Sequence, residues 1–190
     1  MGSNVSSEPR ESIDRLQTGL VHIYCGDGKG KTTCGMGLCL RAAGYGYKVL
    51  IYQFMKDNST SERKILEQVP NVTLVPGLEK EKFSFRMSEQ EKQERRDFYN
   101  GRLREVTEMA VRDGYQVLFL DEAVYCIAAG MLDESVLIDF LKNKPETLEV
   151  ILTGQGPSQQ LMELADYVSE IKKVRHPFDR KIPARPGIER

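Results

Sequence analysis

Gly26-Asp27-Gly28-Lys29-Gly30-Lys31-Thr32-Thr33 is the stretch that decides the fold of this chain. A largely apolar run at 20–24 precedes it, and a stretch rich in alanine, leucine and methionine follows it. A strand, a glycine-rich turn and a helix in this order are typical of a phosphate-binding P-loop. Glycines let several backbone N–H groups point at one place, and the helix adds its positive dipole end. We therefore expect these eight residues to bind a polyphosphate, with the Lys31 ammonium on phosphate oxygens and the Thr32 hydroxyl on Mg²⁺.

The match to the general P-loop pattern is incomplete. That pattern has a glycine five residues before the Gly-Lys pair, where this chain has Cys25. The alternative is a turn rich in glycine and lysine that binds nothing. Three glycines, two lysines and paired threonines between a strand and a helix favour the phosphate site.

Composition limits the class of protein. The 190 residues include 40% hydrophobic and 29% charged residues, which is typical of one soluble globular domain. A net charge of −1 gives no basic field for nucleic acid, and no apolar run approaches the roughly 20 residues of a membrane span.

We expect residues 1–18 to be flexible or helical and residues 19–190 to form a single P-loop α/β domain. The N-terminus lacks the apolar core of a signal peptide, and four cysteines, all expected to be buried, fit a reducing cytoplasm.

Strands and helices are predicted to alternate along the chain. Apolar runs predict strands at 20–25, 48–54, 72–75, 116–122, 149–153 and 167–174. Helices are predicted from the P-loop to about Ala43 with Gly44 as the stop, at 61–69, from a capping box at 88–91 to Gly114, from an Asp133 cap to Asn143, and at 158–165. This order predicts an α/β fold of the P-loop NTPase (RecA-like) type, with a mainly parallel sheet covered by helices on both faces.

Polar residues end several of the predicted strands. Ligands of such sheets bind at the carboxyl ends of the strands, so the P-loop and residues 53–54, 121–122 and 153–155 are expected to share one rim. Asp121 and Glu122 can hold Mg²⁺ opposite Thr32, and Glu122 can instead hold a ribose hydroxyl or position water. The alternative is an acidic cap of the next helix. No serine or cysteine triad and no zinc-type cysteine pair suggests itself, so the chemistry is expected to come from bound ligands.

Segments along most of the chain resemble those of one family, in the same order. After the P-loop they are Arg41-Ala42-Ala43-Gly44-Tyr45-Gly46, Gln53-Phe54-Met55-Lys56, Leu120-Asp121-Glu122, Thr153-Gly154-Gln155, Ala165-Asp166-Tyr167-Val168-Ser169-Glu170, Arg175-His176-Pro177-Phe178 and Gly187-Ile188-Glu189. On these motifs the chain resembles the P-loop ATP:corrinoid adenosyltransferases of the bacterial cobalamin pathway over about residues 19–189. That family also lacks the glycine that Cys25 replaces.

The resemblance implies a reaction and roles for residues. The family transfers the 5′-deoxyadenosyl group of ATP to cobalt(I) of a corrinoid, cob(I)alamin or a precursor, and releases triphosphate. Lys31 and Glu122 are then the expected catalytic residues, with Thr32, Asp121 and Glu122 at Mg²⁺. Arg41 is carried over as a nucleotide contact, with a surface ion pair as the alternative. The resemblance also implies a homodimer and points to a flavin-type reductase as the source of electrons.

An apolar wall under the corrin is a further implication of the resemblance. Cobalt(II) is easier to reduce once its lower axial ligand has left, and an apolar wall offers no replacement ligand. The family uses a Phe-x-Trp segment there, and this chain has Phe83-Ser84-Phe85. The alternative is that Phe83 and Phe85 form one face of a short strand or loop that packs on the core.

The chain departs from the family pattern at three places. Gln155, expected to contact ATP, replaces an arginine and so removes a cation near the triphosphate. Asp57 replaces a glycine, and Arg180-Lys181 lies where glycine is common. These departures leave two other interpretations open. One is a hydrolytic or kinase-like P-loop NTPase, in which Glu122 activates water or orients an acceptor. The other is a non-catalytic paralogue that binds nucleotide or corrinoid.

Overall fold

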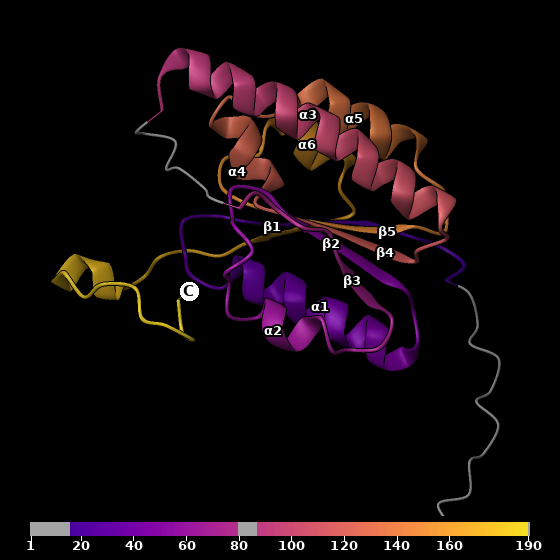
Figure 1. Ribbon diagram of the computed structural model, residues 1–190, viewed down its shortest axis with the longest axis horizontal. Helices are drawn as coiled ribbons and strands as arrows, with labels where there is room; N and C mark the ends of the chain where they lie inside the picture. The colour runs from indigo at the N-terminus through magenta and orange to yellow at the C-terminus, as the bar shows by residue number, and fades with distance from the viewer. Residues whose placement is uncertain (1–15, 80–86, 190) are drawn as a thin grey trace, which may run out of the picture.

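A parallel sheet of six strands forms the centre of the computed structural model, which describes residues 16–79 and 87–189 (Figure 1). The strands are β1 (Val21–Cys25), β2 (Val49–Gln53), β3 (Val72–Leu74), β4 (Val117–Asp121), β5 (Glu149–Thr153) and β6 (Tyr167–Glu170). Their order is β3-β2-β4-β5-β1-β6, and each neighbouring pair is parallel. The parallel sheet is thus confirmed, and only β6 is clearly shorter than predicted, since it ends at Glu170 and not at Val174.

Helices cover both faces of the sheet (Figure 1). One face carries α1 (Lys31–Tyr45) and α2 (Arg63–Leu66), and the other carries α3 (Glu89–Arg112), α4 (Ala123–Ala128), α5 (Glu134–Asn143) and α6 (Gln159–Leu164). Every residue of β2 and β4 is buried, as expected for strands covered on both sides. The predicted fold class is therefore confirmed.

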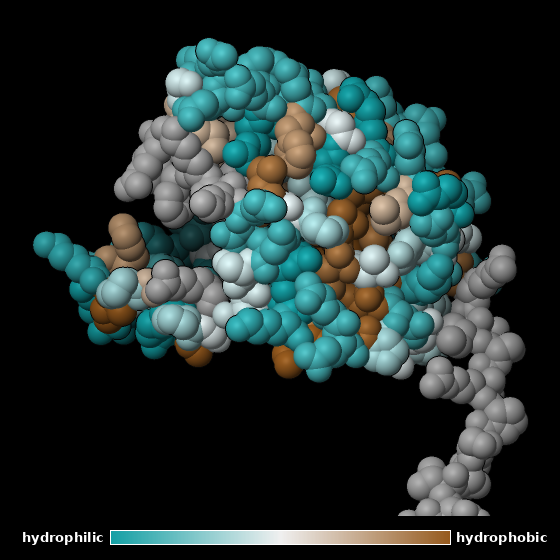
Figure 2. All heavy atoms as spheres, viewed as in Figure 1, coloured by the Kyte–Doolittle hydropathy of each residue, from teal (hydrophilic) through white to brown (hydrophobic). Residues whose placement is uncertain are grey.

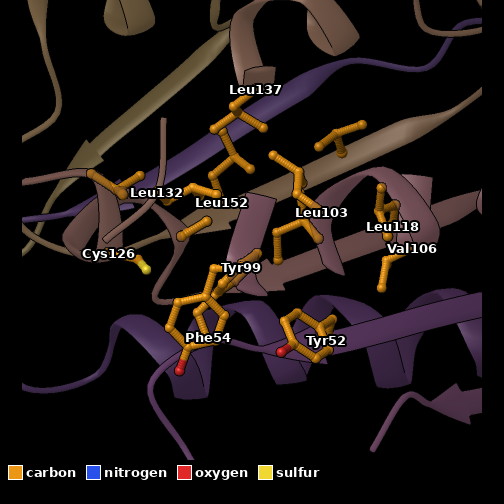
Figure 3. Packing of buried hydrophobic residues seen from close by; sticks show 14 of the residues in the cluster. Tyr52, Phe54, Tyr99, Leu103, Val106, Leu118, Cys126, Leu132, Leu137 and Leu152 are labelled. Atoms are coloured by element: carbon orange, nitrogen blue, oxygen red, sulfur yellow. The ribbon is translucent and has the colours of Figure 1, made fainter. Parts of the chain in front are cut away.

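Each face has its own hydrophobic core. On the α3 side, Tyr99 and Leu103 pack in one buried cluster with Tyr52 and Phe54 of the β2 segment (Figure 3). On the α1 side, a Cβ atom on Gly35 would lie 2.4 Å from the Phe119 ring, so glycine lets α1 approach the sheet closely. The Thr32 hydroxyl in the first turn of α1 donates to Asp121, the last residue of β4, so this packing places the start of α1 at the carboxyl end of that strand.

Helix ends test the predictions most sharply. The capping box at Ser88 is confirmed, since the Ser88 hydroxyl accepts from the Glu91 N–H and the Glu91 carboxylate accepts from the Ser88 N–H. The predicted stop at Gly44 is wrong, because α1 continues to Tyr45. Gly46 ends it in the left-handed conformation with φ 114°, where its N–H bonds the last carbonyls. Asp133 does occupy the N-cap position of α5, but its carboxylate bonds α3 instead.

Two further features differ from expectation. Helix α4 was not predicted, because a short apolar run directly after a strand has no periodicity that separates it from more strand. Cys34 is exposed on α1, whereas the other three cysteines are buried as expected.

The C-terminal residues leave the sheet as an arm. All four residues of β6 are exposed, and beyond them the chain runs outward to a 3₁₀ turn at Pro177–Arg180 (Figure 1). No helix within 16–79 and 87–189 is long and apolar enough to cross a membrane. The expected helical or flexible segment at 1–18 falls mostly outside the described residues, so it stays a prediction.

Candidate active site

The glycine-rich turn joins β1 to α1 at the carboxyl edge of the sheet. Gly26 and Gly30 have φ angles of 105° and 124°, which side chains rarely allow. A Cβ atom on Gly26 would lie 2.4 Å from the Ile171 carbonyl oxygen, and one on Gly28 would lie 2.8 Å from it. The Gly28 N–H donates to that same oxygen over 2.8 Å. The shape of the turn therefore depends on the segment that follows β6.

Lys31 is the first residue of α1 and reaches back over the turn. Its Nζ donates to the Gly28 carbonyl oxygen over 2.8 Å. The N–H groups in the first turn of a helix have no partner within that helix, and the helix dipole makes this end positive. The ammonium group, the loop amides and the helix end together make a site for a polyanion.

Asp121, the last residue of β4, is fully buried and joins four elements. The hydroxyls of Thr32 and Thr153 donate to its Oδ1 over 2.9 and 2.6 Å. Gln53 Nε2 and Lys56 Nζ donate to its Oδ2 over 3.1 and 2.6 Å. These partners come from α1, β5, β2 and the turn after β2. The rim expected from the sequence is therefore assembled around one carboxylate.

Lys56 lies at the centre of this cluster. Besides its contact with Asp121, its Nζ donates to Thr32 Oγ1 over 3.1 Å. Burial alone would lower the pKa of Lys56, but the attraction and hydrogen bond of Asp121, together with the nearby Glu122 and Glu62 carboxylates, raise the pKa. The lysine therefore stays charged and neutralises Asp121.

Glu122 lies at the N-cap position directly before α4 and has a left-handed backbone, φ 60°, which is uncommon for a residue with a side chain. Its N–H donates to Thr153 Oγ1 over 2.8 Å. Burial, and then repulsion from Asp121, raise the pKa of the Glu122 carboxyl, while Lys56 and Lys31 act in the opposite direction. Such strain and such a shifted pKa are typical of functional sites.

Replacing Glu122 by glutamine is expected to remove a pH-dependent loss of stability. Because the folded-state pKa lies above the ordinary value of 4.5, the folded protein holds this proton more tightly than the unfolded chain does. This stabilisation is full below pH 4.5 and is lost as the pH rises through the raised pKa. Urea unfolding without ligands should show the wild type losing stability relative to Glu122→Gln over that range. A constant difference between them would mean that Glu122 does not titrate there.

Comparison with known proteins identifies the family. A family model described as ATP:corrinoid adenosyltransferase BtuR/CobO/CobP matches residues 17–190. The chain belongs to this family. The corrinoid adenosyltransferase of Escherichia coli K12 is 33% identical over 180 residues, which cover 91% of this chain and 86% of the relative. The corrinoid adenosyltransferase CobA of Salmonella typhimurium is 31% identical over 176 residues, with the same two coverages.

A solved structure with a similar backbone is more distant. The KaiC-like protein PH0186 of Pyrococcus horikoshii has a TM-score of 0.49 and 13% identity, and the match covers 82% of this chain and 73% of that protein. The fold described above rests on the strand order and on the helices covering the sheet, and not on this likeness.

The other candidate residues of this adenosyltransferase chain lie at different distances from the cluster. The Asp27 carboxylate accepts from the Lys173 N–H over 2.8 Å, which ties the loop to the C-terminal arm and lowers the pKa of Asp27. Gln155 is exposed in the loop after β5. Arg41 is exposed on α1, about 15 Å along the helix axis from Lys31, and the structure does not bring it to the cluster. Lys29 and Thr33 are exposed on the loop and the first turn of α1.

Lys56 is the site residue that the sequence analysis did not assign. The motif Gln53-Phe54-Met55-Lys56 indicates a resemblance to the family, but it does not identify a charge partner for its lysine. The sequence does contain a signal for this contact. A lysine shortly after one strand and an aspartate at the end of another can form an ion pair at the carboxyl edge of a parallel sheet. The sequence pattern does not predict the strand order, and it is this order that makes β2 and β4 neighbours.

The donors around Thr32 fit Mg²⁺. That ion prefers oxygen ligands and usually takes one or two from the protein and the rest from water and substrate phosphates. The Thr32 hydroxyl and the Asp121 and Glu122 carboxylates are oxygen donors beside the P-loop. Within the described ranges, no group of three or more His, Cys, Asp or Glu residues is arranged to hold a metal ion.

A cavity of about 310 Å³, with more apolar than polar surface, lies where the chain enters α3. Its lining consists of Leu78, Met87, Glu91, Glu94, Arg95 and Phe98. Leu78 and Met87 flank the segment 80–86 on its two sides. Phe83 and Phe85 belong to that segment and lie outside the described residues, so their expected role stays a prediction.

Figure 2 shows the molecular surface hollowed between the C-terminal arm and the rest of the molecule.

Proposed function

We propose that this protein transfers the 5′-deoxyadenosyl group of ATP to cobalt(I) of cobalamin or of a precursor corrinoid, and releases triphosphate. The observation that carries the proposal is the joining of the P-loop to Asp121 through the Thr32 hydroxyl, in a chain of the adenosyltransferase family. A phosphate-binding turn and a metal-binding carboxylate are thereby in direct contact, as a nucleotide site requires.

The proposed reaction does not require the protein to act as a general acid or base. The cobalt(I) electron pair forms the bond to C5′ while the C5′–O5′ bond breaks, and the electron pair of that bond leaves with triphosphate. No proton is transferred in this step, and the nucleophile belongs to the substrate. The chain therefore acts by positioning the two substrates and by stabilising negative charge on the leaving group. Lys31 and the loop amides are the groups placed for that charge.

Mg²⁺ and the corrinoid complete the proposed site. Thr32, Asp121 and Glu122 would hold Mg²⁺, which would supply further positive charge for the triphosphate. The corrinoid is proposed to lie beside the apolar cavity that Leu78, Met87 and Phe98 line. An apolar surface there would exclude water from one side of the corrin, which is the task proposed for Phe83 and Phe85.

The finer properties of the protein are also proposals. Exposure of all four β6 residues, including Tyr167 and Val168, supports a homodimer, because a second copy could cover this edge. Sedimentation velocity would separate the dimer from the monomer.

A flavin-type reductase is proposed to supply the electron that makes cobalt(I). The cytoplasm is the proposed location, since three of the four cysteines are buried thiols.

Incubation with Mg²⁺-ATP and chemically reduced cob(I)alamin is expected to give an adenosylated corrinoid and inorganic triphosphate in equal amounts. The physical reason is that attack at C5′ leaves all three phosphates joined. Phosphorus NMR of the nucleotide products measures this directly, and the spectrum of the corrinoid reports the new cobalt–carbon bond.

A control without corrinoid separates this reaction from hydrolysis. ADP and phosphate as the main products, with or without corrinoid, would favour the P-loop NTPase interpretation. Tight ATP binding with no turnover on cobalt(I) would favour the non-catalytic paralogue.

A further inference from the structure

The ammonium group of Lys56 lies between two groups that also suit a metal ion. Its Nζ is 2.6 Å from Asp121 Oδ2 and 3.1 Å from Thr32 Oγ1. These are two of the three side chains that would hold Mg²⁺ under the proposed function. The lysine thus supplies the positive charge that a fully buried carboxylate needs when no metal is bound.

The backbone directs Lys56 to this position. The preceding residue, Met55, has a φ of 54°, and its N–H donates to the hydroxyl oxygen of buried Tyr99 over 2.9 Å. A positive φ in a residue with a side chain is strained and persists only where the surroundings hold it. Two residues before Met55, the side-chain amide of Gln53 donates to Asp121 Oδ2 over 3.1 Å and to Glu62 Oε1 over 3.0 Å. The turn that carries the lysine is therefore fixed at several points.

An ammonium group and Mg²⁺ cannot use the same oxygens together. Each needs the lone pairs of Thr32 and Asp121, and two like charges so close in a partly buried place repel strongly. Lys56 has a flexible four-carbon stem, and its side chain is 24% exposed, so the ammonium can move outward. Triphosphate on the P-loop would be the nearest strong anion, since Thr32 directly follows Lys31 in α1.

We propose that Lys56 is a triphosphate-binding residue that occupies the metal position until Mg²⁺ arrives and then transfers its ammonium group to a triphosphate oxygen. The proposal rests on the proposed function, because it takes the P-loop as the triphosphate site. It adds a second lysine to the anion site and makes Mg²⁺ and Lys56 competitors for Asp121. Lys56 then adds its positive charge to the triphosphate site only when Mg²⁺ and triphosphate are both bound.

Two titrations test this exchange without any corrinoid. Calorimetry with inorganic triphosphate in excess Mg²⁺ should give a dissociation constant about 10- to 150-fold weaker for Lys56→Met than for the wild type. Electron paramagnetic resonance with Mn²⁺ alone should give binding about tenfold tighter for Lys56→Met, because a competing charge has gone. A lysine that only stabilises the fold would change neither affinity in a folded variant. An unchanged affinity for either ligand overturns the exchange.

Controls keep the result specific. Lys64→Met removes the same charge from an exposed position on α2 and should change neither affinity. Lys56→Gln, which can still donate to Asp121, replaces Lys56→Met if circular dichroism shows that the methionine variant does not fold. Lys31→Ala tests the proposed function separately. If Lys31→Ala binds triphosphate normally, the P-loop site itself fails, whereas loss in Lys31→Ala with none in the Lys56 variants overturns only the role of Lys56.

Discussion

Replacing Lys31 by alanine should weaken ATP binding about 10- to 150-fold and leave the fold intact. The ammonium group lies over the P-loop turn, where it donates to the Gly28 carbonyl oxygen, and would face concentrated negative charge once triphosphate binds. A charge-assisted contact of this kind contributes roughly 1.5–3 kcal/mol, which is about a 10- to 150-fold change in the dissociation constant. Titration with Mg²⁺-ATP measures the change, and circular dichroism checks the fold.

An exposed lysine outside the site provides the matched comparison. Lys64→Ala removes one positive charge from the surface of α2 and should bind ATP as the wild type does. Equal affinities of Lys31→Ala and the wild type would refute the assignment of the P-loop. Equal losses in both variants would show that overall charge, and not the position of Lys31, governs binding.

Replacing Gly154 by alanine should destabilise the protein by roughly 2–6 kcal/mol, the sum of backbone strain and overpacking. Gly154 directly follows β5 with a φ of 144°, and a Cβ atom there would lie 2.3 Å from the Tyr125 backbone nitrogen. Since Tyr125 belongs to α4, the clash would push this helix away from the sheet edge where Glu122 precedes it. Urea unfolding followed by circular dichroism gives the free energy of unfolding.

Gly37 is the matched control for this substitution. It lies within α1, and a Cβ atom there would meet nothing within 4 Å. Gly37→Ala should therefore raise stability by about 0.4–1 kcal/mol, because alanine is the better helix former and the unfolded chain loses freedom. If Gly154→Ala proved as stable as Gly37→Ala, α4 would have to be free to move away from β5.

Local signals in the sequence were enough to predict most of the fold. Runs of four to eight largely apolar residues predicted the strands, and the Ser88 capping box predicted the start of the longest helix, because both depend on neighbouring residues alone. The stop of α1 was misplaced by two residues, since Gly44 and Gly46 are equally suitable by type and only the path of the chain toward β2 selects one.

The sequence predicted which strand ends carry the site residues, but it did not predict which of their side chains contact one another. Thr32 and Asp121 were expected to face each other, and their hydroxyl–carboxylate distance of 2.9 Å agrees with that geometry. The position of Lys56 depends on β2 lying next to β4, although 63 residues separate Gln53 from Val117 in the sequence. It also depends on the strained turn at Met55, which no residue pattern indicates. Arg41 shows the converse, since it matches a family motif but lies about 15 Å along α1 from Lys31, away from the cluster.

The place of β1 in the sheet bears on when the nucleotide site can form during synthesis. Of the six strands in the described residues, β1 is the first to leave the ribosome, yet its two neighbours, β5 and β6, are the last. Nascent β2, β3 and β4 can pair with one another, but β1 has no native neighbour until translation has passed residue 149. The carbonyl of Ile171 that fixes the P-loop turn is made later still. A ribosome must therefore translate past residue 171 before β1 can shape the phosphate loop.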